Sequence, residues 1–170
     1  MAAQPSPRRA AVIGASGYIG THLVPRLVAE GWQVTASSRN TEVLAAREWQ
    51  GVELVQADIL DQASLEQALA GADVVFYLVH CMAAGGNFAE LERQGATNLV
   101  AAANAAGVSR IVYLGGLSPE HPKSQHLQAR LETGRILREA DSPVVELQAG
   151  MIVGPGSAAW EVIRDLVNYL

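Results

Sequence analysis

A glycine-rich segment near the N-terminus carries the clearest chemical signal in the sequence. It reads GASGYIG over residues 14–20 and lies between a short apolar run and an amphipathic stretch. Gly14 allows a tight turn, Gly17 has no Cβ to keep a pyrophosphate from the backbone, and Gly20 lets the helix pack close to the strand. The N–H groups and the positive dipole end of that helix would attract phosphate. The segment therefore predicts a dinucleotide phosphate site, the alternative being a structural turn that binds nothing. The residues assigned to the site are Gly14, Ser16, Gly17, Tyr18, Ile19 and Gly20.

A second polar segment, residues 37–40, bears on the choice of dinucleotide. It reads SSRN, follows the next apolar run and contains no carboxylate. An Asp or Glu at this place usually binds the ribose 2′-hydroxyl of NAD and would repel a 2′-phosphate. The Arg39 guanidinium can instead pair with that phosphate, and Ser38 can add a hydroxyl donor. The segment therefore favours NADP, with NAD as the alternative if Arg39 is only a solvated side chain at a strand end.

Six short apolar runs, rich in β-branched residues, alternate with helical patterns along the chain. Runs of this kind predict strands buried on both faces of a parallel sheet. The strands are expected at 10–13, 33–38, 52–57, 73–79, 110–114 and 144–148, and the helices at 18–30, 41–49, 62–70, 88–106, 124–140 and 157–170. We expect Asp61 to cap the third helix, Asn87 and Glu90 to form a capping box on the fourth, and Gly107 to end it. The alternation predicts a three-layer α/β fold, a doubly wound parallel sheet of about six strands with helices on both faces.

Several of these motifs together resemble the short-chain dehydrogenase/reductase superfamily, in its extended and atypical branches. Within it, the chain is similar to bacterial NAD(P)-binding proteins of the nucleotide-sugar-epimerase-like type. The matching segments are 14–20, 58–59, 76–80, 98–103, 107–114 and 150–156. The resemblance covers nearly the whole chain and implies one NAD(P)-binding Rossmann domain over residues 1–170. Extended relatives continue into a substrate-binding part, which we expect to be missing from these 170 residues.

The resemblance also implies contacts at the carboxyl ends of the third and fourth strands. Asp58 would meet the adenine amino group and Ile59 would add a backbone contact, while Leu78, Val79 and His80 would line the ribose. From the residues alone, Asp58 can equally cap its own turn, and His80 can be an ordinary loop histidine. Cys81 has only a histidine as its basic neighbour, so we expect a half-buried and unreactive thiol.

The catalytic pattern of the superfamily is absent from the sequence. Active members pair a tyrosine with a lysine four residues later, and no Tyr-x-x-x-Lys occurs here. The nearest analogue is His126 with Arg130, and Ser118 is the nearest substitute for the serine that precedes such a pair. A histidine titrates near ~6.5 and can act as an acid without a lysine. We therefore assign no catalytic residue, but we include Arg130 among the cofactor-binding residues because it could bind the nicotinamide ribose.

These observations leave three functions open. The first is an NADP-dependent oxidoreductase of atypical type, acting on an unidentified small molecule. The second is a dinucleotide-binding redox sensor or assembly factor without turnover. The third, a nucleotide-sugar epimerase or dehydratase, is the least favoured because it would need the missing tyrosine and lysine.

Composition and charge exclude other classes of protein. With 170 residues, 49% of them hydrophobic and 17% charged, the chain suits one folded domain and not a disordered segment. A net charge of −5 argues against a nucleic-acid partner, and a single cysteine excludes an internal disulfide and a cysteine-built zinc site. No apolar run approaches the ~20 residues of a membrane helix, so we expect a soluble, cytoplasmic protein. We assign no metal-binding residue. The superfamily often dimerises through the helices expected at 88–106 and 124–140, which makes a homodimer a further expectation.

Overall fold

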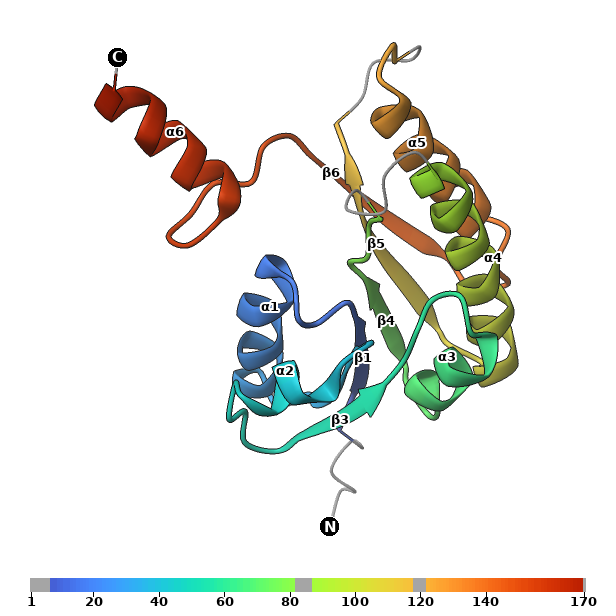
Figure 1. The fold of residues 1–170 in the computed structure, drawn as a ribbon. Helices are drawn as coiled ribbons and strands as arrows, with labels where there is room; N and C mark the ends of the chain where they lie inside the picture. The colour runs from blue at the N-terminus through green and yellow to red at the C-terminus, as the bar shows by residue number, and fades with distance from the viewer. Residues whose placement is uncertain (1–6, 82–86, 118–121, 170) are drawn as a thin grey trace.

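A single parallel sheet forms the centre of the molecule. The computed structural model describes residues 7–81, 87–117 and 122–169. The strands are β1 Arg9–Ile13, β2 Gln33–Ser38, β3 Val52–Gln56, β4 Val74–Tyr77, β5 Arg110–Gly116 and β6 Val144–Ala149. They lie in the order β3-β2-β1-β4-β5-β6, and every neighbouring pair is parallel (Figure 1). The predicted doubly wound sheet is confirmed, and its strand order reverses between β1 and β4, where folds of this kind bind ligands.

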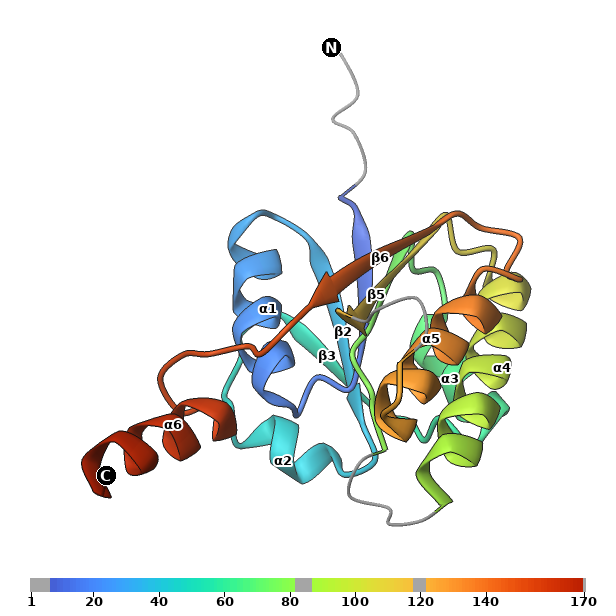
Figure 2. The ribbon, with the colours of Figure 1, turned by 90° about the horizontal axis from the view of Figure 1, so that it is seen from above.

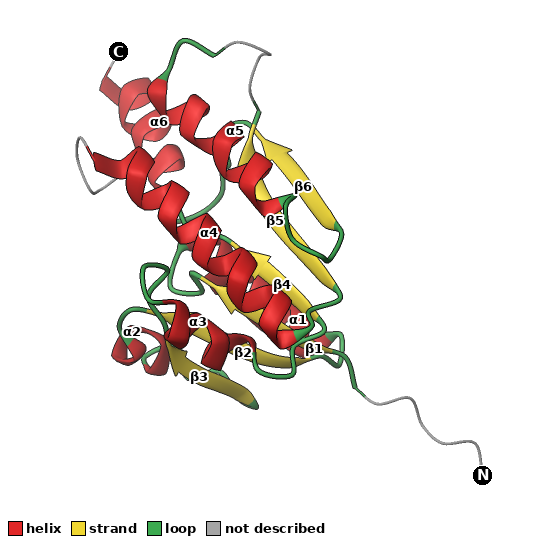
Figure 3. Cartoon of the chain, turned by 90° about the vertical axis from the view of Figure 1, so that its right-hand side faces the viewer, coloured by secondary structure: helices red, strands yellow, loops and turns green. Residues whose placement is uncertain are grey.

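Helices cover both faces of the sheet. They are α1 Tyr18–Ala29, α2 Thr41–Ala45, α3 Gln62–Leu69, α4 Phe88–Ala106, α5 Gln125–Leu137 and α6 Ala158–Tyr169. α1 and α2 lie on one side and α3, α4 and α5 on the other (Figures 1 and 2), and Figure 3 looks onto α4 and α5 in front of the sheet. α2 is shorter than predicted, and shortly after it Glu48 takes φ +53, which a right-handed helix excludes. The three-layer Rossmann architecture is confirmed.

The central strand β1 joins the two layers of the core. Ala11 and Ile13 belong to the cluster that β4 and β5 form with α3, α4 and α5. Ala10 and Val12 belong to the cluster on the side of α1 and α2. Successive side chains of a strand point to opposite faces, so all four are buried and β1 is held from both sides. This fixes the place where the glycine-rich turn begins.

The prediction that every strand is buried on both faces is wrong for the two edge strands. Leu54 of β3 is 37% exposed and Leu147 of β6 is 53% exposed. Each edge strand has a neighbour on one side only, and α6, which follows β6, buries none of its residues. Both Figures 1 and 2 place α6 away from the sheet, so it leaves the β6 face uncovered in the described part of the chain.

Two of the three predicted helix caps are present. The Asp61 carboxylate accepts a first-turn N–H of α3 at 3.1 Å, and Gly107 ends α4 with φ +65. Asn87 holds the N-cap position of α4, but its side chain makes no capping hydrogen bond. Glu90 pairs with Arg93 on the helix surface, so the predicted capping box is not formed.

Candidate functional site

The turn between β1 and α1 is fixed by the end of the neighbouring strand. The N–H groups of Gly14 and Ala15 donate to the carbonyl of Ser37 at 3.2 and 2.9 Å. Gly14 has φ +88, a conformation that favours glycine. A Cβ on Gly14 would also lie 2.9 Å from Cγ2 of Val79, because the end of β4 packs against the turn. The tight turn predicted for Gly14 is therefore confirmed, and its walls come from β2 and β4.

The other two glycines of the segment differ in what surrounds them. A Cβ on Gly20 would lie 2.5 Å from Cα and from the carbonyl oxygen of Ala15, so the helix packs closely at Gly20, but against the turn and not against the strand as predicted. A Cβ on Gly17 would meet only the Gly14 carbonyl oxygen, at 3.5 Å. Gly17 is the N-cap of α1, and neither a side-chain cap nor an acidic residue occupies that end of the helix. The first N–H groups of α1 are thus left for an anion.

A cavity of about 370 Å³ opens at the carboxyl ends of β1 to β4. It is lined by Ile13, Gly14, Ser16, Gly17, Ser38, Arg39, Ala57, Asp58, Ile59, Leu60, Leu78, Val79, His80, Cys81 and Leu91. Ten of these residues are among those assigned from the sequence, namely Gly14, Ser16, Gly17, Ser38, Arg39, Asp58, Ile59, Leu78, Val79 and His80. Segments that are far apart in the chain thus meet in one pocket at the switch point of the sheet.

Four assigned residues lie outside this lining. Tyr18, Ile19 and Gly20 form the first turn of α1, and the Tyr18 ring packs edge-on against His22 with centroids 4.7 Å apart. Arg130 is the fourth, and its surroundings are described below. The lining also contains five residues that were not assigned, namely Ile13, Ala57, Leu60, Cys81 and Leu91. The first four are next to assigned residues in the sequence. Because the ends of parallel strands meet at one edge of the sheet, they could have been assigned to the site as well. Leu91 of α4 has no such signal in the sequence.

Arg39 is the exposed cation of the cavity wall. It follows directly after β2 and makes no ion pair within the described ranges of the chain. Its neighbour Ser38 is buried, and the Ser38 hydroxyl donates to the carbonyl of Asn40 at 2.6 Å. The hydroxyl proton of Ser38 is thus engaged within its own turn, so the Ser38 hydroxyl is not the free donor that the sequence suggested.

Asp58 serves the turn after β3 and lines the cavity at the same time. Its Oδ1 accepts the N–H of Leu60 at 3.0 Å, and its own N–H donates to the Ser64 hydroxyl at 3.0 Å. The carboxylate therefore caps its own turn, as one of the two interpretations of the sequence held. Since Asp58 also lines the cavity, its contact with adenine stays a prediction.

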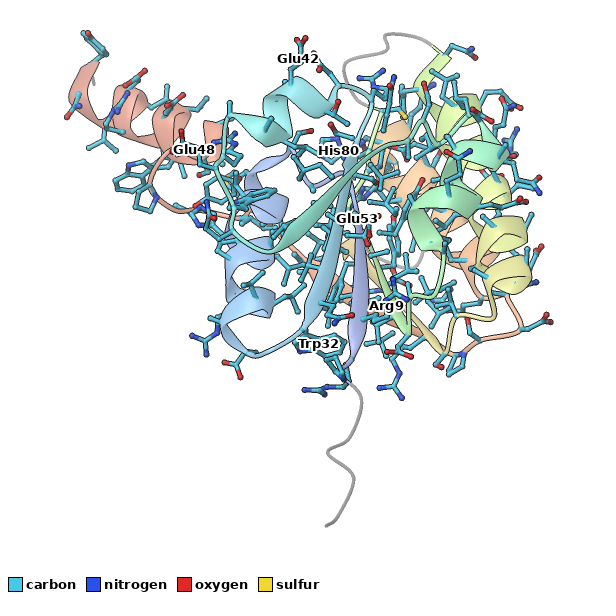
Figure 4. All side chains as sticks on the ribbon, turned by 90° about the horizontal axis from the view of Figure 1, so that it is seen from below. Arg9, Trp32, Glu42, Glu48, Glu53 and His80 are labelled. Atoms are coloured by element: carbon cyan, nitrogen blue, oxygen red, sulfur yellow. The ribbon has the colours of Figure 1, made fainter. Side chains whose placement is uncertain are left out.

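The segment after β4 brings a histidine and a thiol to the cavity. Figure 4 shows His80 and Glu42 toward one end of the sheet and Arg9 and Trp32 at the opposite end. Loss of water around the imidazole, and then the charge of Arg130, lower the pKa of His80, so the ring is neutral at pH 7. Cys81 is half-buried as predicted. Burial, and then the charge of Glu92, raise the pKa of its thiol, which keeps it protonated at neutral pH.

Arg130 is held between β5 and α5. Its guanidinium donates to the carbonyl of Leu114 and lies 5.3 Å from the ring centroid of Tyr113, whose hydroxyl donates to the Arg130 carbonyl at 3.2 Å. Burial raises the pKa of Tyr113 to about 12. The Nδ1 atom of His126, one helical turn before Arg130, is buried and has no hydrogen-bond partner among the described residues. Ser118, the suggested serine substitute, lies outside the described residues.

The described residues contain no group of three or more His, Cys, Asp or Glu side chains arranged to hold a metal ion. Within the same residues, no helix combines the length and apolarity that crossing a membrane requires.

Comparisons with known proteins agree with the fold and with NAD(P) binding. A family model described as NAD(P)H-binding matches residues 14–147. The chain is 28% identical over 149 residues to a ceramide reductase of Caulobacter vibrioides, covering 86% of this chain and 47% of the relative. The triphenylmethane reductase of Citrobacter sp., solved with NADP(H), is 27% identical with a TM-score of 0.73, over 86% of this chain and 50% of that one. The enzyme WbmG of Bordetella bronchiseptica, solved with NAD, shares the fold at 21% identity with a TM-score of 0.78, over 91% of this chain and 57% of that one. The chain thus spans about half the length of these relatives.

Proposed function

Because the chain belongs to this NAD(P)H-binding family, we propose that it is the dinucleotide-binding part of a reductase and that it prefers NADP to NAD. That it is an NAD(P)-binding, reductase-like domain follows from the family and its relatives. The preference depends on one observation, the exposed Arg39 on the cavity wall directly after β2, in a segment without a carboxylate. A guanidinium there would pair with a 2′-phosphate, which NADP has and NAD lacks.

The cavity has groups for several parts of the dinucleotide. In this proposal the pyrophosphate lies on the N-terminus of α1 and the 2′-phosphate on Arg39. The adenine lies beside Asp58 and Ile59, and Leu78 and His80 line the ribose. Two features support this arrangement: the uncapped end of α1 accommodates negative charge, and the apolar residues of the lining suit the flat base.

Proton delivery is the part of the reaction that this chain would perform in an unusual way. Bound NADPH supplies a hydride, and the protein must then hold the acceptor and give it a proton. Since the sequence has no Tyr-x-x-x-Lys, His126 is the candidate proton donor in this proposal, because a histidine side chain can act as an acid without a lysine. One N–H group of the Arg130 guanidinium donates to the Leu114 carbonyl, so its other N–H groups would have to bind the nicotinamide ribose.

A second function, dinucleotide binding without turnover, is favoured by the same two residues. His126 and Arg130 both lie outside the cavity lining, and the Arg130 guanidinium already has a backbone partner. A redox sensor or an assembly factor would need only the binding site.

Titration with NADPH and NADH tests the proposal. We expect tighter binding of NADPH, and we expect Arg39→Ala to weaken NADPH binding about tenfold, because an exposed charged hydrogen bond contributes about 1.5 kcal/mol. NADH binding should not change. Arg47→Ala, which removes an exposed arginine outside the cavity, is the control and should match the wild type. Equal binding of both nucleotides by the wild type would refute the preference. NADPH consumption with a panel of quinones and aldehydes then separates a reductase from a sensor.

A further inference from the structure

A buried carboxylate lies behind one wall of the cavity. Glu92 of α4 is only 4% exposed. The other buried residues of this helix are all small or apolar, namely Gly95, Ala96, Leu99, Ala102 and Ala103. Burying a carboxylate costs free energy unless hydrogen bonds compensate, and an apolar side chain of similar size would pack in the same place. Core packing therefore does not explain why a glutamate occupies this position.

The explanation lies in what the carboxylate contacts. Glu92 Oε1 accepts the backbone N–H of Cys81 at 3.0 Å, which joins α4 to the segment that follows β4. Cys81 and His80 line the cavity, and so does Leu91, the residue before Glu92. The other oxygen, Oε2, is buried and has no partner among the residues that the structure describes. Among the described residues, this carboxylate thus makes one hydrogen bond, and that bond holds a wall of the pocket.

The same segment supports the glycine-rich turn. Val79 lies two residues before Cys81, and its Cγ2 atom is 2.9 Å from the place where a Cβ of Gly14 would be. A shift of this segment would therefore change both the wall of the cavity and the support of the turn.

We propose that Glu92 is a positioning residue, which holds residues 78–81 in place as a wall of the dinucleotide pocket. The inference rests on the proposed function, since it assigns Glu92 a part in binding the nucleotide and not in the fold alone.

Two substitutions at one position separate the hydrogen bond from packing. Glu92→Met keeps a side chain of similar length without an acceptor, whereas Glu92→Gln keeps an acceptor for the Cys81 N–H. We expect Glu92→Met to have the wild-type Tm or a higher one, because an apolar side chain replaces a buried charge. Its Kd for NADPH should rise about tenfold, while Glu92→Gln stays within about threefold of the wild type. Glu90→Met, the same change at an exposed position of α4, is the matched control and should not change Kd.

Alkylation of Cys81 without nucleotide gives an independent readout, because the chain has one cysteine. The rate in Glu92→Gln shows how removing the charge alone changes the alkylation of Cys81. We expect Cys81 to be alkylated severalfold faster in Glu92→Met than in Glu92→Gln, because residues 78–81 are then no longer held by α4. A wild-type Kd for NADPH in Glu92→Met overturns the inference, whether or not alkylation is faster. If the wild-type protein binds neither nucleotide, the proposed function fails, and the alkylation rates still decide whether Glu92 holds Cys81.

Discussion

Substitutions of Gly17 and Gly20 are predicted to have opposite effects, one on nucleotide binding and the other on stability. Gly17→Ala adds a Cβ where the nearest atom is 3.5 Å away, and Gly20→Ala adds one 2.5 Å from two backbone atoms of Ala15. Gly17 has φ −73 and ψ 169, an extended conformation that alanine adopts without strain. We expect Gly17→Ala to fold and to lose nucleotide affinity, and we expect Gly20→Ala to lose stability.

The size of the Gly20 effect follows from its contacts. An ordinary contact begins near 3.4 Å, so α1 or the turn must shift by about 1 Å. The turn resists this shift, because two hydrogen bonds attach it to Ser37. Overpacking costs about 1–3 kcal/mol, here at the upper end since backbone is the partner, and replacing glycine inside a helix returns about 1 kcal/mol. The net loss of about 2 kcal/mol corresponds to a fall in Tm of about 4–8 °C for a chain of this size.

The Gly17 effect is expected mainly in binding. Its stability should change by less than about 1 kcal/mol, the usual effect of a changed N-cap. The new methyl group would lie between the pyrophosphate and the N–H groups of α1. Losing one charged hydrogen bond there raises the Kd for NADPH about tenfold or more. Thermal unfolding and nucleotide titration of both variants make the test. A wild-type Tm for Gly20→Ala, or a wild-type Kd for Gly17→Ala, would refute this account of the turn.

Two further predictions concern the packing of Gly115 against Glu146 and the reactivity of Cys81. A Cβ on Gly115 would lie 2.5 Å from Oε1 of Glu146, a carboxylate that is paired with Arg138 and nearly buried. Gly115→Ala should therefore lower the free energy of unfolding by about 1–2 kcal/mol, and by much less in a Glu146→Ala background. An equal loss in both backgrounds would show that Glu146 is not the cause. Because the pKa of the Cys81 thiol is raised above its ordinary value of 9.0, its iodoacetamide alkylation rate should keep rising with pH beyond 9.0, and a plateau below that pH would show that burial does not protect the thiol.

The sequence by itself determined the local elements and much of the pocket. Strand and helix patterns depend on neighbouring residues, so the sheet, the tight turn at Gly14 and the close packing at Gly20 could be predicted. Ser38, Asp58 and Leu78 lie at the carboxyl ends of separate strands. Because parallel strands end at one edge of the sheet, their meeting could be predicted as well. For the same reason, NAD(P) binding could be predicted from the sequence.

Only the tertiary structure decided which partner each side chain has. Arg130 of α5 donates to the Leu114 carbonyl of β5, a contact that residue type does not predict. The bonds of Ser38 to Asn40 and of Leu60 to Asp58 are different, because each lies within a short turn that polar side chains commonly stabilise. The edge position of β6 and the separation of α6 from the sheet likewise depend on which elements cover which face. Glu92 is the clearest case, because its bond to Cys81 forms only when α4 packs beside the end of β4. Spacing along the chain predicts where an element lies, whereas a hydrogen bond between distant segments depends on packing that no short segment contains.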